Sequence, residues 1–437
     1  MTVVYSADWV LPVEGPPIPD GGVAVQDGRI AAVGPADVLE GELRAFPDSV
    51  IVPGFVNAHT HLEYAVYAGF GDGLAFIPWL ELHIERKRRL EQGDTVAIAR
   101  LGAAECLRSG ITTLGDASFT GAAAHACAEL GLRAVVYLEV FGGDVPAARE
   151  RFEELRADAS DALSERVALG VSPHAPYTVS VSVYAAMAEL GLPVATHLAE
   201  SEAEEQWLVH GRGPIAAYDQ EIPPHGGDTG IRLLARSGLL GPGVVAAHCV
   251  TADAEEIALL AEHDVAVAHC PRSNAFLGCG IAPLAELLAA GIRVGLGTDS
   301  PASTPSFDMF EETRAAIYAA RARERRPDAL SAAGALQLAT LGSARALGLA
   351  DEVGSLAAGK RADLAVVSLA GSQYLPWEDP TVAVVFGGSP ERVLLTLVDG
   401  ETRYEKGGFE WHELRRAAAA ARGRMLSEAR PAATSKT

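Results

Sequence analysis

The sequence contains few Lys and Arg residues relative to Asp and Glu, which argues against partners with many phosphate groups. Its 437 residues hold 35 Lys and Arg against 57 Asp and Glu, which gives a formal net charge of −22. Nucleic acids are bound by clustered Lys and Arg, and anionic membrane surfaces attract the same residues. We therefore expect neither nucleic acid nor membrane as a partner, and solubility best explains the acidic balance.

Cysteine and long apolar runs are also scarce. The five cysteines are odd in number and include no Cys-x-x-Cys pair, which favours buried or metal-adjacent thiols in a reducing cytoplasm over a disulfide framework. No run of about 18 apolar residues predicts a membrane span. The start of the chain lacks the basic segment and apolar stretch of a signal peptide. The sequence thus predicts a cytoplasmic protein.

What the sequence does contain, between about 55 and 350, is a regular alternation of short apolar runs with Ala-, Leu-, Glu- and Arg-rich helical stretches. This is the pattern of a parallel sheet. The runs lie at 50–56, 111–116, 134–139, 167–171, 193–197, 244–248, 265–269 and 293–299. A doubly wound open sheet would also alternate. Eight consecutive units with polar residues at nearly every strand end favour an α/β fold of the TIM type, a (β/α)8 barrel.

Both ends of the chain carry strand patterns of a different kind. Residues 23–26 and 29–33 flank Asp27-Gly28, a pair typical of a two-residue hairpin turn. Strands are also predicted near 359–367, 393–398 and 402–404, before a helix at 409–428 and a disordered tail. We expect a small β-sandwich domain built from both ends. The predicted units are 1–54 (first part of the β domain), 55–351 (catalytic barrel) and 352–437 (rest of the β domain, terminal helix and tail).

The pair His59-Thr60-His61 directly follows the first apolar run. In an extended strand, side chains two residues apart point to the same side, so both imidazoles emerge together. Neutral imidazoles suit a borderline metal such as zinc. Because such pairs also occur by chance on surface strands, the meaning of this one depends on the other strand ends.

Further metal-binding residue types follow other runs: His197 after the fifth, His248 after the sixth and Asp299 after the eighth. Catalytic groups of a barrel lie at the C-terminal ends of its strands. Three imidazoles and one carboxylate, with a position left for water, fit a catalytic metal. Each residue alone has a structural alternative, such as helix capping by Asp299. Their joint placement favours function.

Glu200 lies three residues after His197. If the chain turns there, both side chains can face the barrel mouth, and a carboxylate beside an activated water can carry protons. Composition alone favours a solvated glutamate, since Glu202, Glu204 and Glu205 follow. The position relative to His197 favours a catalytic role instead.

These motifs together resemble the amidohydrolase superfamily, in its branch that contains cytosine deaminases and deaminases of S-adenosylhomocysteine and other 5′-substituted adenosines. The matching segments are PGFVNAHTH (53–61), SPHAPY (172–177), HLAE (197–200), AHC (247–249), HCPRSN (269–274), GTD (297–299) and GKRADL (359–364). The resemblance covers about residues 1–405.

The resemblance implies a role for each matching residue. One divalent metal, zinc by preference with iron, manganese or nickel as alternatives, would be bound by His59, His61, His197 and Asp299. Asp299 would also accept a proton from the attacking water, and His248 would orient that water or polarise the substrate. Glu200 would protonate the ring nitrogen beside the attacked carbon and then assist the departure of ammonia. Substrate contacts are expected from His174, Trp79, Glu63, Arg272 and Asn274.

One residue type is missing from the fourth strand. Superfamily members with two metals usually bridge them with a modified lysine at the end of this strand, whereas here it ends Ser172-Pro173-His174. Together with Glu200, the missing lysine favours a one-metal deaminase over two-metal hydrolases of amides or phosphoesters.

The chain departs from its relatives in the segment 70–90, the expected flap after the first strand. Related nucleoside deaminases carry an acid there, several residues after a tryptophan, that holds the ribose hydroxyls. An ungapped match from Trp79 places a basic residue at that position. Either Glu81 or Glu85 substitutes, or the substrate lacks this ribose contact.

The connection at 201–242 is long, and it resembles that of aminodeoxyfutalosine deaminases of menaquinone biosynthesis. His210 and His225 within it are expected at the surface. The sequence therefore predicts a deaminase of an aminated heteroaromatic ring, first a 5′-modified 6-aminopurine nucleoside: aminodeoxyfutalosine, then S-adenosylhomocysteine or methylthioadenosine.

Three alternatives remain beside that prediction: a triazine, guanine or pterin aminohydrolase or chlorohydrolase, a two-metal amide hydrolase, and a catalytically silent binding relative. The silent relative is disfavoured because every ligand position is filled. Relatives often assemble, so a homo-oligomer acting on a small molecule is expected.

Overall fold

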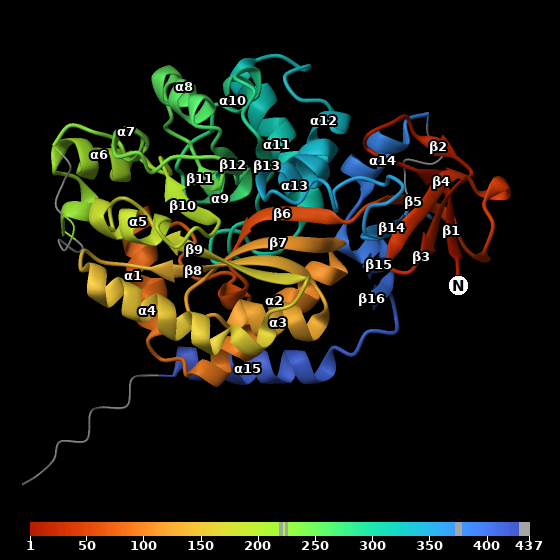
Figure 1. Ribbon diagram of the computed structural model, residues 1–437, viewed down its shortest axis with the longest axis horizontal. Coiled ribbons are helices and arrows are strands. Elements are labelled where there is room, and N and C mark those ends of the chain that lie inside the picture. Colours follow the sequence, from red (N-terminus) through yellow and green to blue (C-terminus); the bar gives the residue numbers. More distant parts are fainter. Residues whose placement is uncertain (218–221, 223–225, 372–377, 428–437) are drawn as a thin grey trace, which may run out of the picture.

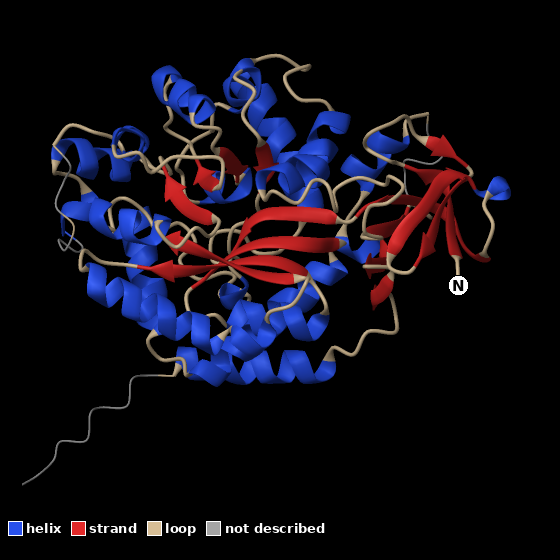
Figure 2. Cartoon of the chain, in the orientation of Figure 1, coloured by secondary structure: helices blue, strands red, loops and turns tan. Residues whose placement is uncertain are grey.

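The computed structural model describes residues 1–217, 222, 226–371 and 378–427, and it contains two sheets (Figures 1 and 2). The larger body is an all-parallel sheet of eight strands in sequential order. Its strands are β6 (Phe55–Thr60), β7 (Ile111–Ser118), β8 (Arg133–Val140), β9 (Val167–Pro173), β10 (Val194–Leu198), β11 (Val244–His248), β12 (Ala266–His269) and β13 (Val294–Leu296). Seven of these strands coincide with a predicted run, whereas the first run, 50–56, overlaps β6 only at residues 55–56 and otherwise lies in the strand Glu42–Pro53 of the second sheet.

The sheet closes between its first and last strands. Thr60 pairs with Asp299 in a parallel bridge, and the Asp299 N–H donates to the His59 carbonyl oxygen at 3.0 Å. The predicted (β/α)8 barrel is confirmed. Closure also brings His59 and Asp299, which are 240 positions apart in the sequence, onto adjacent backbone.

Helices surround the barrel in Figure 1. They are α1 (Phe76–Lys87), α2 (Gln92–Arg108), α3 (Ala122–Leu130), α4 (Val145–Asp158), α5 (Val181–Ala188), α6 (Glu202–His210), α7 (Gly230–Arg236), α8 (Ala254–Glu262), α9 (Pro271–Phe276), α10 (Leu284–Ala289), α11 (Met309–Glu324), α12 (Ala332–Gln337) and α13 (Ser343–Ala346). The starts of several of them are set by capping side chains. Asp144, Ser180, Ser201 and Asp253 each accept a backbone N–H three residues ahead, which satisfies a donor that has no partner within the helix.

Shorter helical segments link these elements. They are η1 (Ala36–Val38), η2 (Leu62–Tyr64), η3 (Ser160–Ala162), η4 (Pro214–Ala217), the π-helical η5 (Leu338–Gly342) and η6 (Pro390–Arg392). Segment η2 follows His61 directly, so it fixes the chain where it leaves the first barrel strand. Together α12, η5 and α13 form one continuous helical stretch after α11.

The second sheet joins the two chain ends, as predicted. Its order is β16-β15-β14-β5-β1-β3-β4, with β2 paired to β1. The strands are β1 (Val3–Val10), β2 (Ile18–Pro19), β3 (Gly21–Gln26), β4 (Arg29–Pro35), β5 (Glu42–Pro53), β14 (Leu364–Ser368), β15 (Val393–Val398) and β16 (Glu401–Glu405). Helix α14 (Pro380–Gly387) follows β14 and precedes β15 in the chain. The predicted hairpin is present, with φ of 51° at Asp27 and 77° at Gly28, the values of a tight primed turn. The exact domain limits stay a prediction.

The terminal helix α15 (His412–Leu426) packs on the barrel rather than on the second sheet; Figure 1 shows it beneath α2. Ala421 and Met425 are buried in a cluster with Ile98, and Arg424 forms an ion pair with Asp94 of α2. No helix among the described residues is long and apolar enough to cross a membrane. The tail predicted to be disordered and His225 lie outside the described residues.

Candidate metal and catalytic centre

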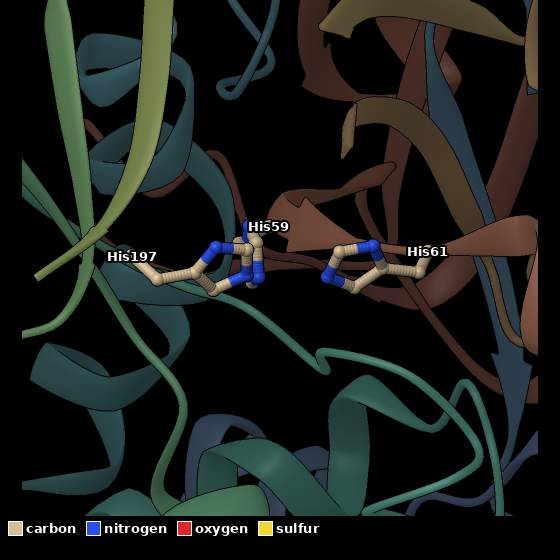
Figure 3. Close-up of side chains that lie close together, drawn as sticks. All are labelled: His59, His61 and His197. Carbon is tan, nitrogen blue, oxygen red and sulfur yellow. The ribbon is translucent and has the colours of Figure 1, made fainter. Parts of the chain in front are cut away.

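Three histidine side chains converge at the C-terminal mouth of the barrel. His59 is the last residue but one of β6, His61 follows that strand directly, and His197 lies near the end of β10. Their rings face one another in Figure 3, and one nitrogen of each lies within 4.8 Å of the others. Asp299 completes the group, since its Oδ1 lies 3.4 Å from His61 Nε2 and 3.7 Å from His59 Nε2.

These residues fit a divalent metal ion. Ligands bound tetrahedrally at about 2.1 Å lie roughly 3.4 Å apart, which is close to the two Asp299 distances. The Nε2 atom of His59 is buried and has no hydrogen-bond partner among the described residues, although buried polar atoms are normally paired. A cation between these atoms would supply the missing partner.

The outward nitrogens of the ligands are fixed by further contacts. His61 Nδ1 lies 2.8 Å from the Ala117 carbonyl oxygen, and His197 Nδ1 lies 2.8 Å from that of His174. A carbonyl can only accept, so each Nδ1 carries the proton and each Nε2 lone pair faces the site. Such contacts orient metal ligands.

The electrostatics of the centre keep the imidazoles neutral and the carboxylate charged. Burial lowers the pKa of His61 to about 4, although Asp299 opposes the shift, and burial also lowers the pKa values of His59 and His197. For Asp299, burial raises the pKa, but His248, His61 and His59 outweigh that effect and hold it below its ordinary value. Neutral imidazole and ionised carboxylate are the protonation states that bind metals.

Asp299 is held by two serine hydroxyls. Its Oδ2 accepts from Ser273 at 2.6 Å and from Ser303 at 3.0 Å. These bonds orient Oδ2 away from the histidines and leave Oδ1 facing His59 and His61.

Glu200 and His248 lie beside the histidine cluster. Glu200 Oε1 is 3.8 Å from His248 Nε2, and His248 Nδ1 is 2.9 Å from Asn274 Oδ1. Asn274 thereby leaves an acceptor lone pair on His248 Nε2, directed at the site. Burial raises the pKa of Glu200 to about 7, although the nearby His197 opposes it. A carboxyl group with this pKa can give and take a proton near neutral pH.

The strand ends at the centre contain strained backbone. Positive φ values occur at Ala199 (51°), His248 (75°), Cys249 (48°) and Asp299 (55°). Left-handed backbone costs a residue other than glycine about 1–2 kcal/mol. Strain of this kind gathers at functional sites, where it aims side chains. Here the turn at Ala199 brings Glu200 to the same side as His197.

A cavity of about 580 Å³ opens over the centre, a size typical of small-molecule sites. Its walls include the predicted residues His61, His197, Glu200, His248 and Asp299, and also His174 and Trp79. The Trp79 Nε1–H donates to the Ala302 carbonyl oxygen, so its ring is fixed in the wall. Helix α1 of the predicted flap supplies this wall.

The other three predicted substrate contacts lie elsewhere. Glu63 is buried and accepts hydrogen bonds from Ser118 and Thr120. Arg272 and Asn274 line a second cavity, of about 620 Å³, behind the centre. The structure thus places Asn274 in contact with His248 and does not bring Glu63 or Arg272 to the first cavity. Direct substrate contact by these three stays an untested prediction.

Two acids of the site were not singled out from the sequence. Glu139, at the end of β8, lines the cavity. Glu204 accepts the backbone N–H groups of Ala199 and Glu200, both at 3.0 Å, and is buried rather than solvated. For Glu204, the sequence did contain a signal of a structural role, because the spacing Ser201-x-x-Glu204 matches a capping box.

A closed barrel with an imidazole and carboxylate cluster at its mouth and a titratable acid beside it defines a metal-dependent hydrolase. The chain matches the sequence profile of the amidohydrolase family over residues 50–403, and it belongs to that family. The family uses a divalent metal, which agrees with the cluster.

Comparison with similar proteins narrows the class of hydrolase to deaminases. The chain is 36% identical over 412 residues to a 5-methylthioadenosine/S-adenosylhomocysteine deaminase of Moorella thermoacetica, covering 91% of this chain and 93% of the relative. It is 35% identical over 427 residues to a 5′-deoxyadenosine deaminase of Methanothermobacter thermautotrophicus, covering 91% and 94%. A crystal structure of an adenosine deaminase from Xanthomonas campestris with bound zinc superimposes with a TM-score of 0.85 at 30% identity, covering 97% and 98%. The family and the hydrolytic deaminase class expected from the sequence are confirmed.

Proposed function

We propose that this chain removes the 6-amino group of a 5′-substituted adenosine by hydrolysis. The observation that carries the proposal is the placement of Glu200 and His248 beside the three-histidine cluster, in a cavity of small-molecule size. The relatives named for methylthioadenosine, S-adenosylhomocysteine and 5′-deoxyadenosine support this substrate class.

Zinc is the metal we propose. His59, His61, His197 and Asp299 would hold it, a donor set of nitrogen and oxygen atoms that suits zinc. When bound, the ion supplies Lewis acidity and makes a hydroxide nucleophile available near neutral pH.

The protein groups handle the protons of the reaction. Water adds its oxygen to C6, the C6–N bond breaks, and ammonia leaves while a carbonyl forms. In this proposal Asp299 accepts a proton from the water, and the His248 Nε2 lone pair accepts a hydrogen bond from its other O–H. Glu200 delivers a proton to the ring nitrogen beside C6 and then to the departing amine.

The side chains in the outer wall of the cavity indicate which kind of 5′-substituent the substrate carries. Lys87 and Arg88 line it, and Lys87 Nζ lies 3.8 Å from the centre of the Phe119 ring. Cations beside aromatic walls favour an apolar substituent with a carboxylate. S-adenosylhomocysteine carries such a group and methylthioadenosine does not. Aminodeoxyfutalosine, the first substrate expected from the sequence, also carries a carboxylate and stays a candidate.

The test is ammonia release by the zinc-loaded enzyme. The panel contains S-adenosylhomocysteine, methylthioadenosine, 5′-deoxyadenosine, aminodeoxyfutalosine, adenosine, guanine and melamine. We expect the highest kcat/KM for a 5′-substituted adenosine with a carboxylate. A higher value for guanine or melamine, or no ammonia from any member with one metal bound per chain, would contradict the proposal.

A further inference from the structure

Glu139 is a buried acid that faces the cavity without a complete set of partners. Its side chain is 4% exposed and forms part of the cavity wall. Its Oε1 atom has no hydrogen-bond partner within the part of the chain that the structure describes. Leaving such an oxygen unpaired costs about 1–3 kcal/mol, so a ligand that brings a donor would relieve that cost.

A second metal is a poor explanation for this acid. Glu139, His174 and His197 do lie within mutual reach of one ion. However, His197 Nδ1 is bound to the His174 carbonyl oxygen, so His197 has one nitrogen to offer, and that nitrogen already faces His59 and His61. Two residues would remain, fewer than the three protein ligands of catalytic zinc sites. A hydrogen-bonding role therefore fits Glu139 better.

The flap offers no acid to the cavity. Glu81 and Glu85 of α1, the two substitutes considered from the sequence, are exposed and do not line it. Glu85 is instead paired with Arg89. Among the described residues that line the cavity, the acids are Glu139, Glu200 and Asp299.

Glu139 adjoins the centre on the side of His174, since one carboxylate oxygen of Glu139 and one nitrogen each of His174 and His197 lie within 4.8 Å of one another. Glu200 and Asp299 belong to the centre, whereas Glu139 lies on β8, two strands from the β10 strand of His197, with His174 of the β9 end between them. The His174 ring stacks on Phe141 at 4.8 Å. A purine whose C6 lies at the centre would therefore extend past His174 towards Glu139. The donors that all the proposed substrates share, apart from the purine, are the 2′- and 3′-hydroxyls of the sugar.

We propose that Glu139 accepts hydrogen bonds from the sugar hydroxyls of the substrate and replaces the acid that the flap lacks. This inference rests on the proposed deamination of a nucleoside. A carboxylate can accept from both hydroxyls of a vicinal diol at once. The chain would thus recognise the same sugar as its relatives from a different strand of the barrel.

The experiment compares two substrates in three enzymes. S-adenosylhomocysteine and its 2′,3′-dideoxy analogue are assayed with zinc-loaded wild type, Glu139→Gln and Glu256→Gln. Glu256 is a matched control because it is also a buried acid but caps α8, where glutamine serves as well.

We expect wild type and Glu256→Gln to prefer the diol by about tenfold to a hundredfold in kcat/KM. In Glu139→Gln the preference should fall to within about threefold, mainly through a higher KM for the diol, with the dideoxy analogue little changed. A preference that persists in Glu139→Gln, or an equal loss on both substrates, would overturn the role of Glu139 alone. No turnover of either substrate by wild type would overturn the proposed function and this inference with it.

A second variant guards against misfolding. Glu139→Asp keeps the carboxylate but withdraws it by one methylene, and we expect a preference between those of wild type and Glu139→Gln. Full wild-type preference in a folded Glu139→Asp, together with an unfolded Glu139→Gln, would also overturn the assignment.

Discussion

Glu200 is the single residue on which the proposed chemistry depends most. It is buried, its pKa is raised to about 7 by that burial, and Oε1 lies 3.8 Å from His248 Nε2. Exposed glutamates titrate near 4 and would stay ionised at neutral pH. Burial in the turn after β10 therefore gives this carboxyl a proton to deliver.

Replacing Glu200 by glutamine should separate metal binding from catalysis. The change keeps the shape but removes the exchangeable proton, so kcat should fall by about 10²- to 10⁴-fold. Metal content, measured by elemental analysis, should stay at the wild-type value because Glu200 is not among the proposed ligands. Near wild-type turnover by Glu200→Gln would reject its assigned role.

At the residue scale, most residues of the centre could be predicted from their positions directly after predicted strands. His59, His61, His197, His248 and Asp299 each follow an apolar run, and barrel closure brings them together. Glu139 carries the same signal at the end of β8, but it has no neighbouring His or Asp in the sequence to mark it. Its importance depends on cavity shape and on an unpaired oxygen, which are properties of packing.

At the element scale, the turn between β10 and α6 depends on Glu204. This carboxylate accepts two consecutive backbone N–H groups, from Ala199 and Glu200. Ala199 has a φ of 51°, which is unfavourable for alanine. The two hydrogen bonds therefore offset local strain and fix the direction of Glu200.

Glu204→Gln should weaken this turn, since an amide has one acceptor oxygen for two N–H donors. We expect a loss of about 1–3 kcal/mol in the free energy of unfolding and a kcat lower by about tenfold to a hundredfold. Urea unfolding and steady-state kinetics measure these. Glu205→Gln, at the next, exposed position, is the control, and equal effects of both changes would contradict the role of Glu204.

The helix α15 provides a second test at this scale. Met425 is fully buried, whereas its neighbour Leu426 is 43% exposed. Met425→Ala should lower the free energy of unfolding by about 2–5 kcal/mol through lost packing against the barrel. Leu426→Ala should change it by less than about 1 kcal/mol. Similar values for both in urea unfolding would show that α15 does not pack as described.

The elements themselves were largely predictable, and their packing partners were less so. Apolar runs located all eight barrel strands, and Asp27-Gly28 located the hairpin. The helix near 409–428 was also expected, but its apolar residues do not specify a partner. Its docking on α2 depends on tertiary packing, which the pattern of the helix alone does not reveal.

At the scale of the whole molecule, two sheets share one continuous stretch of chain. Strand β5 of the second sheet leads into β6 of the barrel through Gly54, where an added Cβ would lie 2.2 Å from the Thr112 side chain. The close contact requires glycine, and it sets where His59 and His61 leave the strand. The cytoplasmic location and the homo-oligomer expected from the sequence stay predictions.

The class of enzyme was predictable because it depends on a few residues of defined chemistry. The substrate was not, because it depends on how walls from α1, β8 and β9 enclose a volume. Lys87 and Glu139 illustrate the difference. Each is an ordinary charged residue in the sequence, and the fold places both in one cavity.

The most direct measurement follows the oxygen that replaces the amino group. Zinc-loaded enzyme is incubated with S-adenosylhomocysteine in ¹⁸O-labelled water, and the product is analysed by mass spectrometry. The account predicts one ¹⁸O atom on the purine ring, at C6, with one ammonia released for each product molecule. An intact 6-amino group, with cleavage at the glycosidic or thioether bond or with no product at all, would contradict it.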